Sequence, residues 1–422
     1  MAENGKPESP LSGVGVAMSP IASMNILLAH NDYARFSGEE AAIENVARAL
    51  MDHDHAVSWF RRSSTGIGDS VLRKGQALFS GIYSFDARHA LARLLDQHTF
   101  DVAQVQNLYP FLSASILPEL KSRDIPVVMR CPNYRLFCPT GLHLRDGHVC
   151  EECLGGLREW HCVRHNCESD WFKSIGYAAR NAFGRLTGMI TGNVDVFVAL
   201  TEFQRSRFGA AGIPVDRIEI LPNPASVQPE GELRAGGSYV GFVGRVSEEK
   251  GIAEFLQAAR RLTGIEFRVA GNLDAQLRLD KIPLNVHFDG FLSGQALDDF
   301  YAQSRIMVFP SKWFEGFPNT IAMAMGHAKP VIGTAIGAIP EIVEDGETGL
   351  LARPGDGDDL ADKIAHLWRR PDLCAEMGRA GWLKAQREYS HERFYERLMQ
   401  IYARAQTLQG RQKAAVVGGQ GA

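Results

Sequence analysis

The sequence predicts an α/β protein with two doubly wound, Rossmann-like domains that face a central cleft. Three observations lead to this prediction. Short apolar strands alternate with amphipathic helical segments along most of the chain, as in parallel sheets that are covered by helices. The chain has 422 residues, which is more than one hydrophobic core usually organises. A connector rich in Pro and Gly, residues 221–237, separates two such series of elements.

The first series predicts an N-terminal domain at residues 24–215. Residues 25–29 are typical of a buried strand, 30–38 of a loop, and 39–52 of a helix with one apolar stripe. Further strands are expected at residues 56–60, 102–106, 126–130 and 195–200.

The second series predicts a C-terminal domain at residues 216–385. Its strands are expected at residues 239–243, 266–270, 286–288, 305–309 and 330–334, with helices such as 252–262 and 295–304 between them. Ligands of such sheets bind beyond the carboxyl ends of the strands, so the loops that follow strands are the candidate sites. The terminal segments 1–23 and 409–422 are rich in small and polar residues, and we expect both to be disordered.

The composition argues against several classes of function. The net charge of −4 lacks the basic surplus that binding to nucleic acid needs. No apolar run reaches the ~18 residues that span a bilayer. The first residues lack the basic start and the continuous apolar stretch of a secretory signal. We therefore expect a cytoplasmic protein, with the inner face of the membrane as an alternative location.

The loop after the strand at 239–243 is a candidate phosphate site. Gly244 allows a close approach of the backbone, and Arg245 and Lys250 bring two cations to the start of a helix. Free amides at a helix N-terminus together with basic side chains are typical of diphosphate binding. The alternative is a surface loop with solvated charges.

The loop after the strand at 305–309 is a second candidate. Glu315 can accept hydrogen bonds from sugar hydroxyls, and it stands just before an apolar helix. The backbone amides of the following residues can hold phosphate or hydroxyl oxygens. The candidate residues are Phe317, Asn319 and Thr320, together with Pro318, which lies between them but has no amide hydrogen to donate. A simpler function for Asn319 and Thr320 is to cap the helix.

Six of the seven cysteines fall between residues 131 and 167. Without an export signal the thiols should stay reduced, so the cluster indicates metal binding rather than disulfides. We predict a structural zinc site within an insert at 131–168, held by Cys138, Cys150, Cys153 and Cys167. Cys162, His161 and His165 are alternatives to Cys167, and a set of free thiols is the alternative to a metal site.

Together these motifs resemble the retaining glycosyltransferases of family four, which have the GT-B fold. The resemblance runs through residues 240–251, 308–321, 324–332, 337–343 and 345–351, and more loosely through the N-terminal domain. It implies the transfer of a hexosyl group from a nucleotide-diphosphate sugar to a glycan or lipid-linked saccharide, in surface polysaccharide biosynthesis. It also implies a C-terminal helix at 386–408 that crosses back to the first domain.

The resemblance assigns functions to individual residues. Arg245 and Lys250 would hold the donor diphosphate and stabilise the leaving group, so that catalysis needs no metal ion or other cofactor. Glu315 would bind the transferred sugar, with the backbone from Gly316 to Asn319 around it. Gly38 belongs to a loop that approaches the donor phosphate and the acceptor, although Ser37 stands where the family has its first glycine.

Two departures from the family affect the site. The family usually has a ribose-binding glutamate eight positions after the first, where this chain has Met323, which cannot accept a hydrogen bond from a ribose hydroxyl. Core packing is the simpler function for Met323. The family often has a histidine near Pro132, and Asn133 and Arg135 are candidate substitutes on the acceptor side. His30, in the loop expected after the first strand, is a third acceptor-side candidate.

Other interpretations remain open at this level. An aromatic and basic helix is expected at residues 171–186. We expect it to pack on its own sheet, with peripheral contact to a membrane or a lipid-linked acceptor as the alternative. For the whole chain, the rivals of a transferase are a nucleotide-sugar epimerase of the same fold and a non-catalytic scaffold that lost the ribose-binding glutamate.

Overall fold

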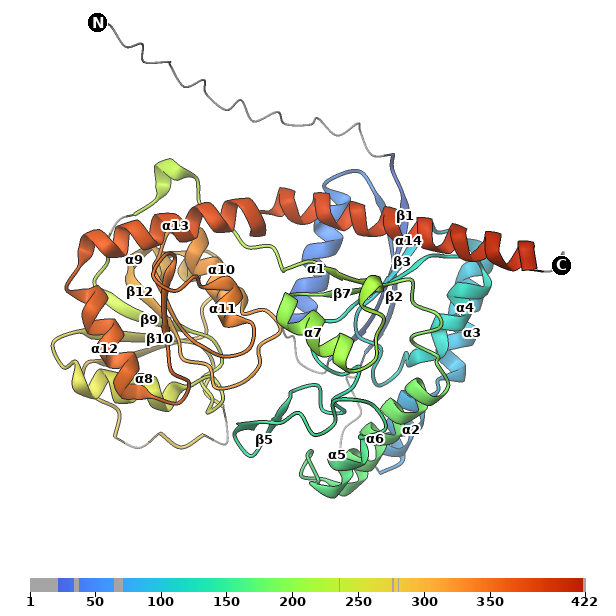
Figure 1. Cartoon of the computed structure of the whole chain (residues 1–422), viewed down its shortest axis with the longest axis horizontal. Helices are drawn as coiled ribbons and strands as arrows, with labels where there is room; N and C mark the ends of the chain where they lie inside the picture. The colour runs from blue at the N-terminus through green and yellow to red at the C-terminus, as the bar shows by residue number, and fades with distance from the viewer. Residues whose placement is uncertain are drawn as a thin grey trace, which may run out of the picture.

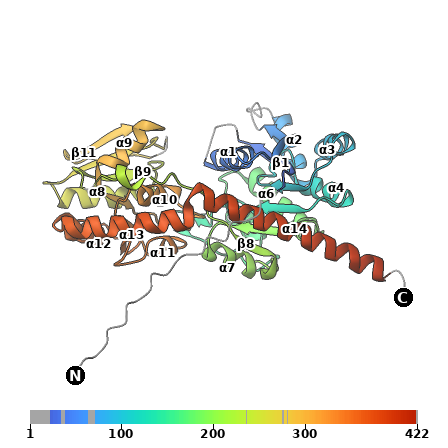
Figure 2. The same ribbon diagram turned by 90° about the horizontal axis from the view of Figure 1, so that it is seen from above.

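The computed structural model describes residues 22–33, 38–63, 71–234, 236–274, 277–279 and 281–419. Two α/β domains lie side by side, and a pair of long helices at the C-terminus runs across both of them (Figures 1 and 2). Each domain has a six-stranded parallel sheet, which confirms the predicted fold class. No helix among the described residues has the length and apolarity to cross a membrane.

The N-terminal sheet has the strand order β2-β1-β3-β4-β7-β8. Its strands are β1 (Asn25–Asp32), β2 (Ala56–Ser63), β3 (Val102–Val105), β4 (Val127–Arg130), β7 (Val196–Ala199) and β8 (Ile218–Ile220). Its helices are α1 (Gly38–Met51), α2 (Val71–Ile82), α3 (Phe85–Gln97), α4 (Leu117–Ser122), α6 (Trp171–Leu186) and α7 (Glu202–Ala210).

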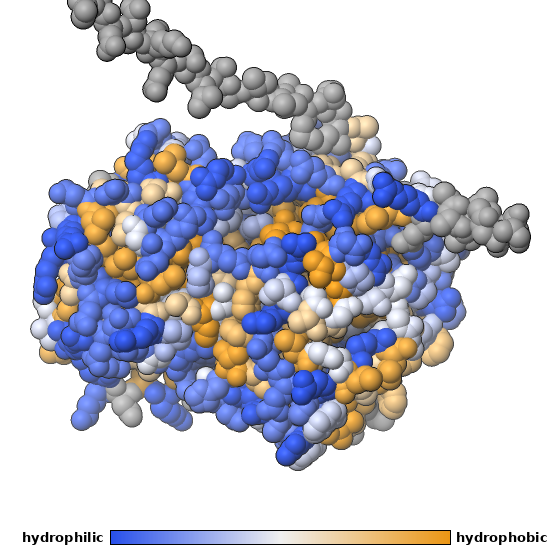
Figure 3. All heavy atoms as spheres, viewed as in Figure 1, coloured by the Kyte–Doolittle hydropathy of each residue, from blue (hydrophilic) through white to orange (hydrophobic). Residues whose placement is uncertain are grey.

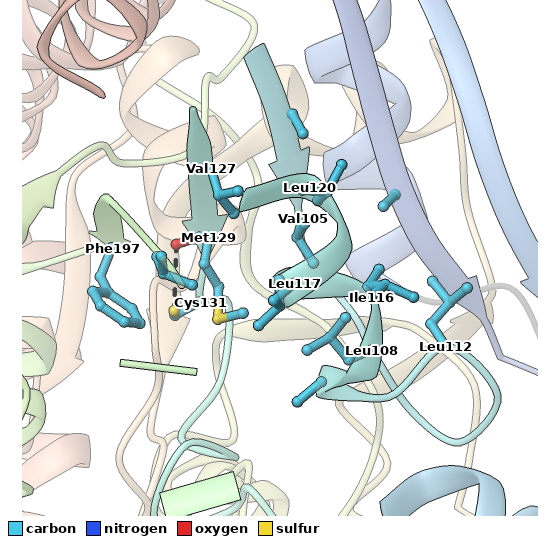
Figure 4. Close-up of a cluster of buried hydrophobic side chains, with 14 of the residues drawn as sticks. Val105, Leu108, Leu112, Ile116, Leu117, Leu120, Val127, Met129, Cys131 and Phe197 are labelled. Atoms are coloured by element: carbon cyan, nitrogen blue, oxygen red, sulfur yellow. Dashed lines mark hydrogen bonds between the residues drawn. The ribbon is translucent and has the colours of Figure 1, made fainter. Parts of the chain in front are cut away.

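Strand β1 shows why the sheet has a core on both faces. Its side chains alternate, so that Leu27 packs with α3 and α4 on one face while Ile26 and Leu28 pack with α1 and the last helix on the other. Figure 4 shows part of the first face, where side chains from β3, β4 and α4 meet. The thiol of Cys131 lies in this core and donates a hydrogen bond to the Met129 carbonyl oxygen at 3.5 Å.

The C-terminal sheet has the strand order β11-β10-β9-β12-β13-β14. Its strands are β9 (Tyr239–Val243), β10 (Glu266–Ala270), β11 (Val286–Gly290), β12 (Ser304–Phe309), β13 (Val331–Thr334) and β14 (Gly349–Ala352). Its helices are α8 (Ile252–Arg261), α9 (Gln295–Gln303), α10 (Asn319–Gly326), α11 (Ile339–Ile342), α12 (Gly357–Trp368) and α13 (Pro371–Tyr389). Helix α8 buries Ile252, Phe255, Leu256 and Ala259 on one stripe, as its periodicity predicts.

Helix α14 (His391–Gly419) lies against the N-terminal sheet although it follows the C-terminal domain. Phe394 and Leu398 pack on the sheet, and the Tyr402 hydroxyl donates a hydrogen bond to Gln104 Oε1 at 2.7 Å. The helix continues to Gly419, so the predicted helix end at residue 408 is too early and the predicted disorder of 409–422 is wrong for 409–419. Residues 420–422 and most of the segment 1–23 lie outside the described residues.

Strand β8 corrects the predicted domain boundary at residue 216, because it is the edge strand of the N-terminal sheet. Strand β8, with three residues, and strand β14 (Gly349–Ala352) were not predicted from the sequence. Strand β1 continues to Asp32, so His30 lies in a strand rather than in the predicted loop. Strand β2 ends three residues later than predicted, and the remaining predicted strands are found within two residues of their expected bounds.

The cysteine-rich insert lies between β4 and β7. It contains the antiparallel hairpin of β5 (Leu144–Arg145) and β6 (His148–Val149), the short helix α5 (Trp160–Arg164), and then α6. Helix α6 does not pack as predicted. Its buried side carries Ser174, Arg180 and Asn181, while its apolar stripe is exposed.

Candidate functional site

Both sheets reverse their strand order at one point, and this point positions the candidate site. In the C-terminal sheet the reversal lies between β9 and β12, and in the N-terminal sheet between β1 and β3. Crossover connections leave in opposite directions there, which opens a crevice beyond the carboxyl ends of the two strands. The loops after β9 and β12 are the two loops that the sequence analysis selected.

A cavity of about 200 Å³ lies at the C-terminal reversal. It brings together most of the predicted donor-site residues, which come from three elements. Those residues are Gly244, Lys250, Glu315, Phe317, Pro318, Asn319 and Thr320. Phe242, Phe309 and Ser311 also line it and were not predicted. Phe309 ends β12 and Phe242 lies one residue before the end of β9, so their sequence pattern indicates only a buried strand.

Glu315 is the centre of a hydrogen-bond network in this cavity. Its Oε1 oxygen accepts from Lys250 Nζ at 2.6 Å, from Trp313 Nε1 at 2.8 Å and from Ser311 Oγ at 3.1 Å. Among the described residues no donor reaches Oε2, so that oxygen can accept hydrogen bonds from a ligand. Glu315 is 8% exposed, and such burial strengthens its pairing with the Lys250 ammonium group.

The backbone holds the two loops together. Gly251 has φ 77°, and a Cβ atom there would lie 1.8 Å from the Pro310 carbonyl oxygen. Only glycine satisfies both conditions. The Lys312 amide also donates to the Glu249 carbonyl oxygen at 2.8 Å. These contacts explain why Lys250 and Glu315 meet although 65 residues separate them.

Arg245 does not line the cavity in this structure. Its guanidinium group pairs with the Glu249 carboxylate and is half exposed. Asn319 also differs from one prediction, because its side chain does not cap α10, whose N-cap residue is Pro318. The Asn319 Oδ1 atom instead accepts from Asn223 Nδ2 at 2.6 Å.

Asn223 connects the two domains. It lies in the segment between β8 and β9, and its Oδ1 atom accepts from Arg130 Nη2 at 2.5 Å. Arg130 ends strand β4 and is almost fully buried, and burial lowers the pKa of its guanidinium group to about 10. The chain from Arg130 through Asn223 to Asn319 therefore joins the N-terminal sheet to the first turn of α10. Arg130 and Asn223 were not predicted as site residues from the sequence.

Further contacts close the floor of the cleft. The Tyr134 hydroxyl donates to the Glu315 carbonyl oxygen at 3.1 Å, and Thr201 Oγ1 donates to the Gly316 carbonyl oxygen at 3.3 Å. A Cβ atom at Gly316 would lie 2.7 Å from the Pro132 carbonyl oxygen, so only glycine allows this approach. The loop that carries Glu315 is thus positioned by both domains.

The N-terminal reversal holds the predicted acceptor-side residues. Asn133 Nδ2 donates to Glu39 Oε1 at 2.6 Å. Arg135 pairs with the Tyr33 hydroxyl and donates to Asn107 Oδ1 at 3.3 Å. Asn133, Arg135 and Asn107 line a second cavity, whereas His30 does not.

His30 is fully buried beside this cavity. Neither ring nitrogen has a hydrogen-bond partner among the described residues, and Nε2 lies 3.8 Å from Asp32 Oδ1 and 3.9 Å from Glu40 Oε1. Burial lowers the pKa of His30, although the two carboxylates oppose this shift. Gly38 begins α1 with open space around it, and Ser37 lies outside the described residues.

Five cysteines line one cavity in the insert: Cys138, Cys150, Cys153, Cys162 and Cys167. The Cys162 and Cys167 side chains are hydrogen-bonded to each other. The histidine alternatives lie elsewhere, because His161 Nδ1 and His165 Nε2 approach Glu152 Oε2 at 3.0 and 2.8 Å. His161 and His165 do not line the thiol cavity, whereas Cys162 does.

Met323 is half-buried on α10 and packs against the core between α10, β13 and α13. It does not line the donor cavity. The structure therefore supports core packing for this side chain.

Comparisons with known proteins agree with this architecture. Residues 237–370 match the family model "Glycosyl transferases group 1". A protein of Klebsiella pneumoniae described as an uncharacterized 42.6 kDa protein in the cps region is 24% identical over 339 residues, which cover 76% of this chain and 87% of that protein.

Two further relatives extend this comparison. The capsular polysaccharide biosynthesis glycosyltransferase CapM of Staphylococcus aureus is 28% identical over 205 residues, which cover 46% of this chain and 53% of CapM. The crystal structure of Anabaena HepE in complex with UDP and glucose superposes with a TM-score of 0.59 at 14% identity, over 90% of this chain and 99% of HepE. This superposition covers both domains of the chain.

Proposed function

From the premise that residues 237–370 form a glycosyl transferases group 1 domain and that the whole chain has the GT-B fold, we propose that the protein is a retaining glycosyltransferase. It transfers a hexosyl group from a nucleotide-diphosphate sugar to a glycan or lipid-linked saccharide, in surface polysaccharide biosynthesis. The observation that carries the proposal is the Lys250–Glu315 pair in the cavity at the C-terminal reversal.

The donor diphosphate would bind between Lys250 and the first turn of α10. The free amides of that turn and the Lys250 ammonium group both favour negative charge, which grows on the leaving group as the glycosidic bond breaks. No metal ion is needed for this stabilisation. Arg245 would add a second cation after it exchanges Glu249 for the diphosphate.

The transferred sugar would bind beside Glu315. Its hydroxyls would donate to the Oε2 oxygen, while Lys250, Trp313 and Ser311 hold Oε1 in place. The acceptor would enter from the N-terminal reversal, where Asn133 and Arg135 line the second cavity and His30 lies close by. Both domains hold the Glu315 loop, so a small closure of the cleft would align the two substrates and exclude water.

The relatives support the substrate classes. The name of CapM refers to the biosynthesis of capsular polysaccharide, and the HepE crystal holds UDP and glucose. The intact network around Glu315 supports a binding site over a scaffold, because a site that has lost its ligand has no need to retain three donors on one buried carboxylate oxygen.

The experiment measures binding of nucleotide diphosphates and nucleotide sugars by calorimetry. The variants are Lys250→Ala and Glu315→Ala, and Lys312→Ala is the matched control, because Lys312 lies on the same loops but pairs with Glu254 at 3.3 Å outside the cavity. We expect selective binding that the two site variants weaken and the control does not. Absence of binding to any nucleotide by the folded protein would refute the donor site.

Product analysis then identifies the reaction. Transfer with retention should give a product whose anomeric proton shows the same configuration as the donor sugar by NMR. Conversion of the donor sugar in the absence of an acceptor would instead identify an epimerase.

We further propose a structural zinc ion in the insert. The five thiols that line one cavity of about 20 Å³ are a donor set suited to zinc, and four of them suffice for a closed tetrahedral site. Cys138, Cys150 and Cys153 would bind together with Cys167 or Cys162. Bound zinc would cross-link the β5–β6 hairpin to α5 and add no catalytic chemistry.

Metal content tests this assignment. We expect a stoichiometric zinc ion by mass spectrometry in the wild type and in Cys131→Ala, whose thiol lies in the N-terminal core, and none in Cys153→Ser. A metal-free wild type that unfolds at the same temperature with and without a chelator would refute the site.

A further inference from the structure

Helix α6 has its amphipathic pattern turned outward. Trp171, Ile175, Ala179, Ala182 and Leu186 follow one another at helical spacing and form its solvent-facing stripe, with Phe172 beside them. The large members of this stripe are between 49% and 70% exposed. A surface helix of a soluble domain normally shows the opposite arrangement.

The inward side of α6 accounts for this orientation. Arg180 Nη2 donates to the Pro139 carbonyl oxygen at 2.7 Å, and Asn181 Nδ2 donates to the Arg135 carbonyl oxygen at 2.7 Å. Polar contacts to the loop after β4 thus hold the helix in register. Rotation of the helix to bury the stripe would leave these groups without partners, so the exposed stripe is part of the folded state.

The stripe continues onto the neighbouring helices. A Cβ atom at Gly176 would lie 1.6 Å from Leu78, so α6 and α2 are in close contact. The Tyr83 ring lies 6.5 Å from the Phe183 ring and 4.6 Å from the Phe85 ring. Phe79 of α2 and Phe85, which begins α3, are 71% and 68% exposed. Hydrophobic surface gathers at the lower right of the molecule, where α2 and α6 lie (Figure 3).

The charge of this surface indicates what covers it. Neither α2 nor α6 contains an Asp or Glu residue, although the chain as a whole has a net charge of −4. Lys173 is exposed beside the stripe, and Arg164 lies over the exposed Trp160 ring at 5.9 Å. Two acidic residues border the face, and both are engaged: Asp170 caps α6, and Asp86 pairs with Arg62 at 3.3 Å. Exposed Trp and Phe side chains on two helices without acidic residues, with flanking cations, match the interface of an anionic bilayer.

We propose that the α2–α6 face, defined by Phe79, Phe85, Trp171, Phe172, Ile175 and Leu186, docks the protein peripherally on a membrane with anionic lipids. The aromatic and aliphatic side chains enter the boundary between headgroups and acyl chains, and the cations contact the headgroups. This inference is independent of the donor site, because none of these residues lines the donor cavity.

The experiment is co-sedimentation of the full chain with two kinds of vesicle, phosphatidylcholine alone and phosphatidylcholine with about one-third phosphatidylglycerol. We expect binding to the anionic vesicles, weakened by salt. The double variant Phe79→Ser/Ile175→Ser should lower the partition coefficient about tenfold or more. The matched control is Phe291→Ser, which removes a side chain of the C-terminal domain that is 68% exposed, like the side chains of the docking face.

Further variants separate the alternatives. Lys173→Glu should weaken binding to anionic vesicles only, while Lys281→Glu, an exposed lysine of the C-terminal domain, should not. Lys250→Ala should bind vesicles like the wild type, so failure of the donor site and failure of this proposal are distinguishable. Absence of vesicle binding, or equal binding by the folded double variant, would overturn the proposal. So would concentration-dependent dimerisation that the double variant abolishes, because a second copy would then cover the face.

Discussion

At the reversal of the C-terminal sheet, three donors converge on one oxygen of Glu315. At the reversal of the N-terminal sheet, Asn31 and Asn107 bind each other instead. The Asn31 amide donates to the Asn107 carbonyl oxygen at 2.8 Å, and Asn107 Nδ2 donates to the Asn31 carbonyl oxygen at 2.6 Å. The first reversal has a Lys–Glu pair directed at its cavity. At the second, amide groups hold the two strand ends together, and the charged side chains of Arg135 and Glu39 lie beside them.

This difference shows that topology determines where a ligand can bind but not what it is. Both crevices follow from parallel strands and crossover connections. Their chemistry comes from loop residues such as Lys250 and Glu315, which the strand order does not specify.

The largest expected effect is at the reversal of the C-terminal sheet. Lys250→Ala should lower kcat about 10²- to 10³-fold, because it removes a preorganised cation that stabilises the leaving group. Steady-state kinetics with a saturating acceptor measure this effect, with Lys312→Ala as the control. A fall in activity that comes entirely from a higher KM for the donor would contradict a role in the transition state.

A smaller effect is expected at the reversal of the N-terminal sheet. Arg135→Ala should raise the KM for the acceptor about tenfold and leave the affinity for the nucleotide unchanged, because Arg135 lines the second cavity and not the donor cavity. The comparison of acceptor KM with nucleotide Kd from calorimetry tests the division of the two substrates between the domains. Equal weakening of both would show that the two crevices are one site.

A still smaller effect, on stability, is expected for the hydrogen-bonded connection through Asn223 between the two domains. Asn223→Ala should lower the free energy of unfolding by about 1–3 kcal/mol, because it leaves the buried Arg130 guanidinium group and the Asn319 oxygen without this partner. Urea denaturation measures the change. Asn272→Ala, at an exposed position of the C-terminal domain, should stay within about 0.5 kcal/mol of the wild type.

The smallest effect is expected at Met323. Met323→Leu should change the stability by less than about 1.5 kcal/mol and leave nucleotide binding within about twofold, because the side chain packs on the core and does not line the donor cavity. A large loss of nucleotide affinity in calorimetry would contradict core packing and indicate that Met323 contacts the nucleotide.

The sequence was sufficient to predict the elements with strong local signals. The strand at Tyr239–Val243 and the stripe of α8 follow from periodicity, and the loops after β9 and β12 were recognised from glycine, basic and acidic residues in a fixed order. Strands β8 and β14 were missed, although β3, β4, β7 and β13, which have four residues like β14, were predicted. Arg130 and Asn223 were missed because each is unremarkable alone, and their importance lies in the contact between them.

Helix α6 shows that a sequence pattern also does not determine which face of a helix is buried. Its periodicity predicted an amphipathic helix correctly, but the usual preference for burying the apolar stripe led to the wrong face. The polar contacts of Arg180 and Asn181 to the loop after β4 outweigh that preference. A one-dimensional pattern contains no information about such partners.

By itself, the sequence determined the fold class, the order of the elements and the two loops of the donor cavity, because these depend on local propensity and on short motifs. Only the tertiary structure decided that Lys250 pairs with Glu315, that Arg245 turns to Glu249, and that five thiols share one cavity. These outcomes depend on which segments, distant in the chain, the packing of both sheets brings within hydrogen-bond distance, and local residue patterns do not specify such contacts.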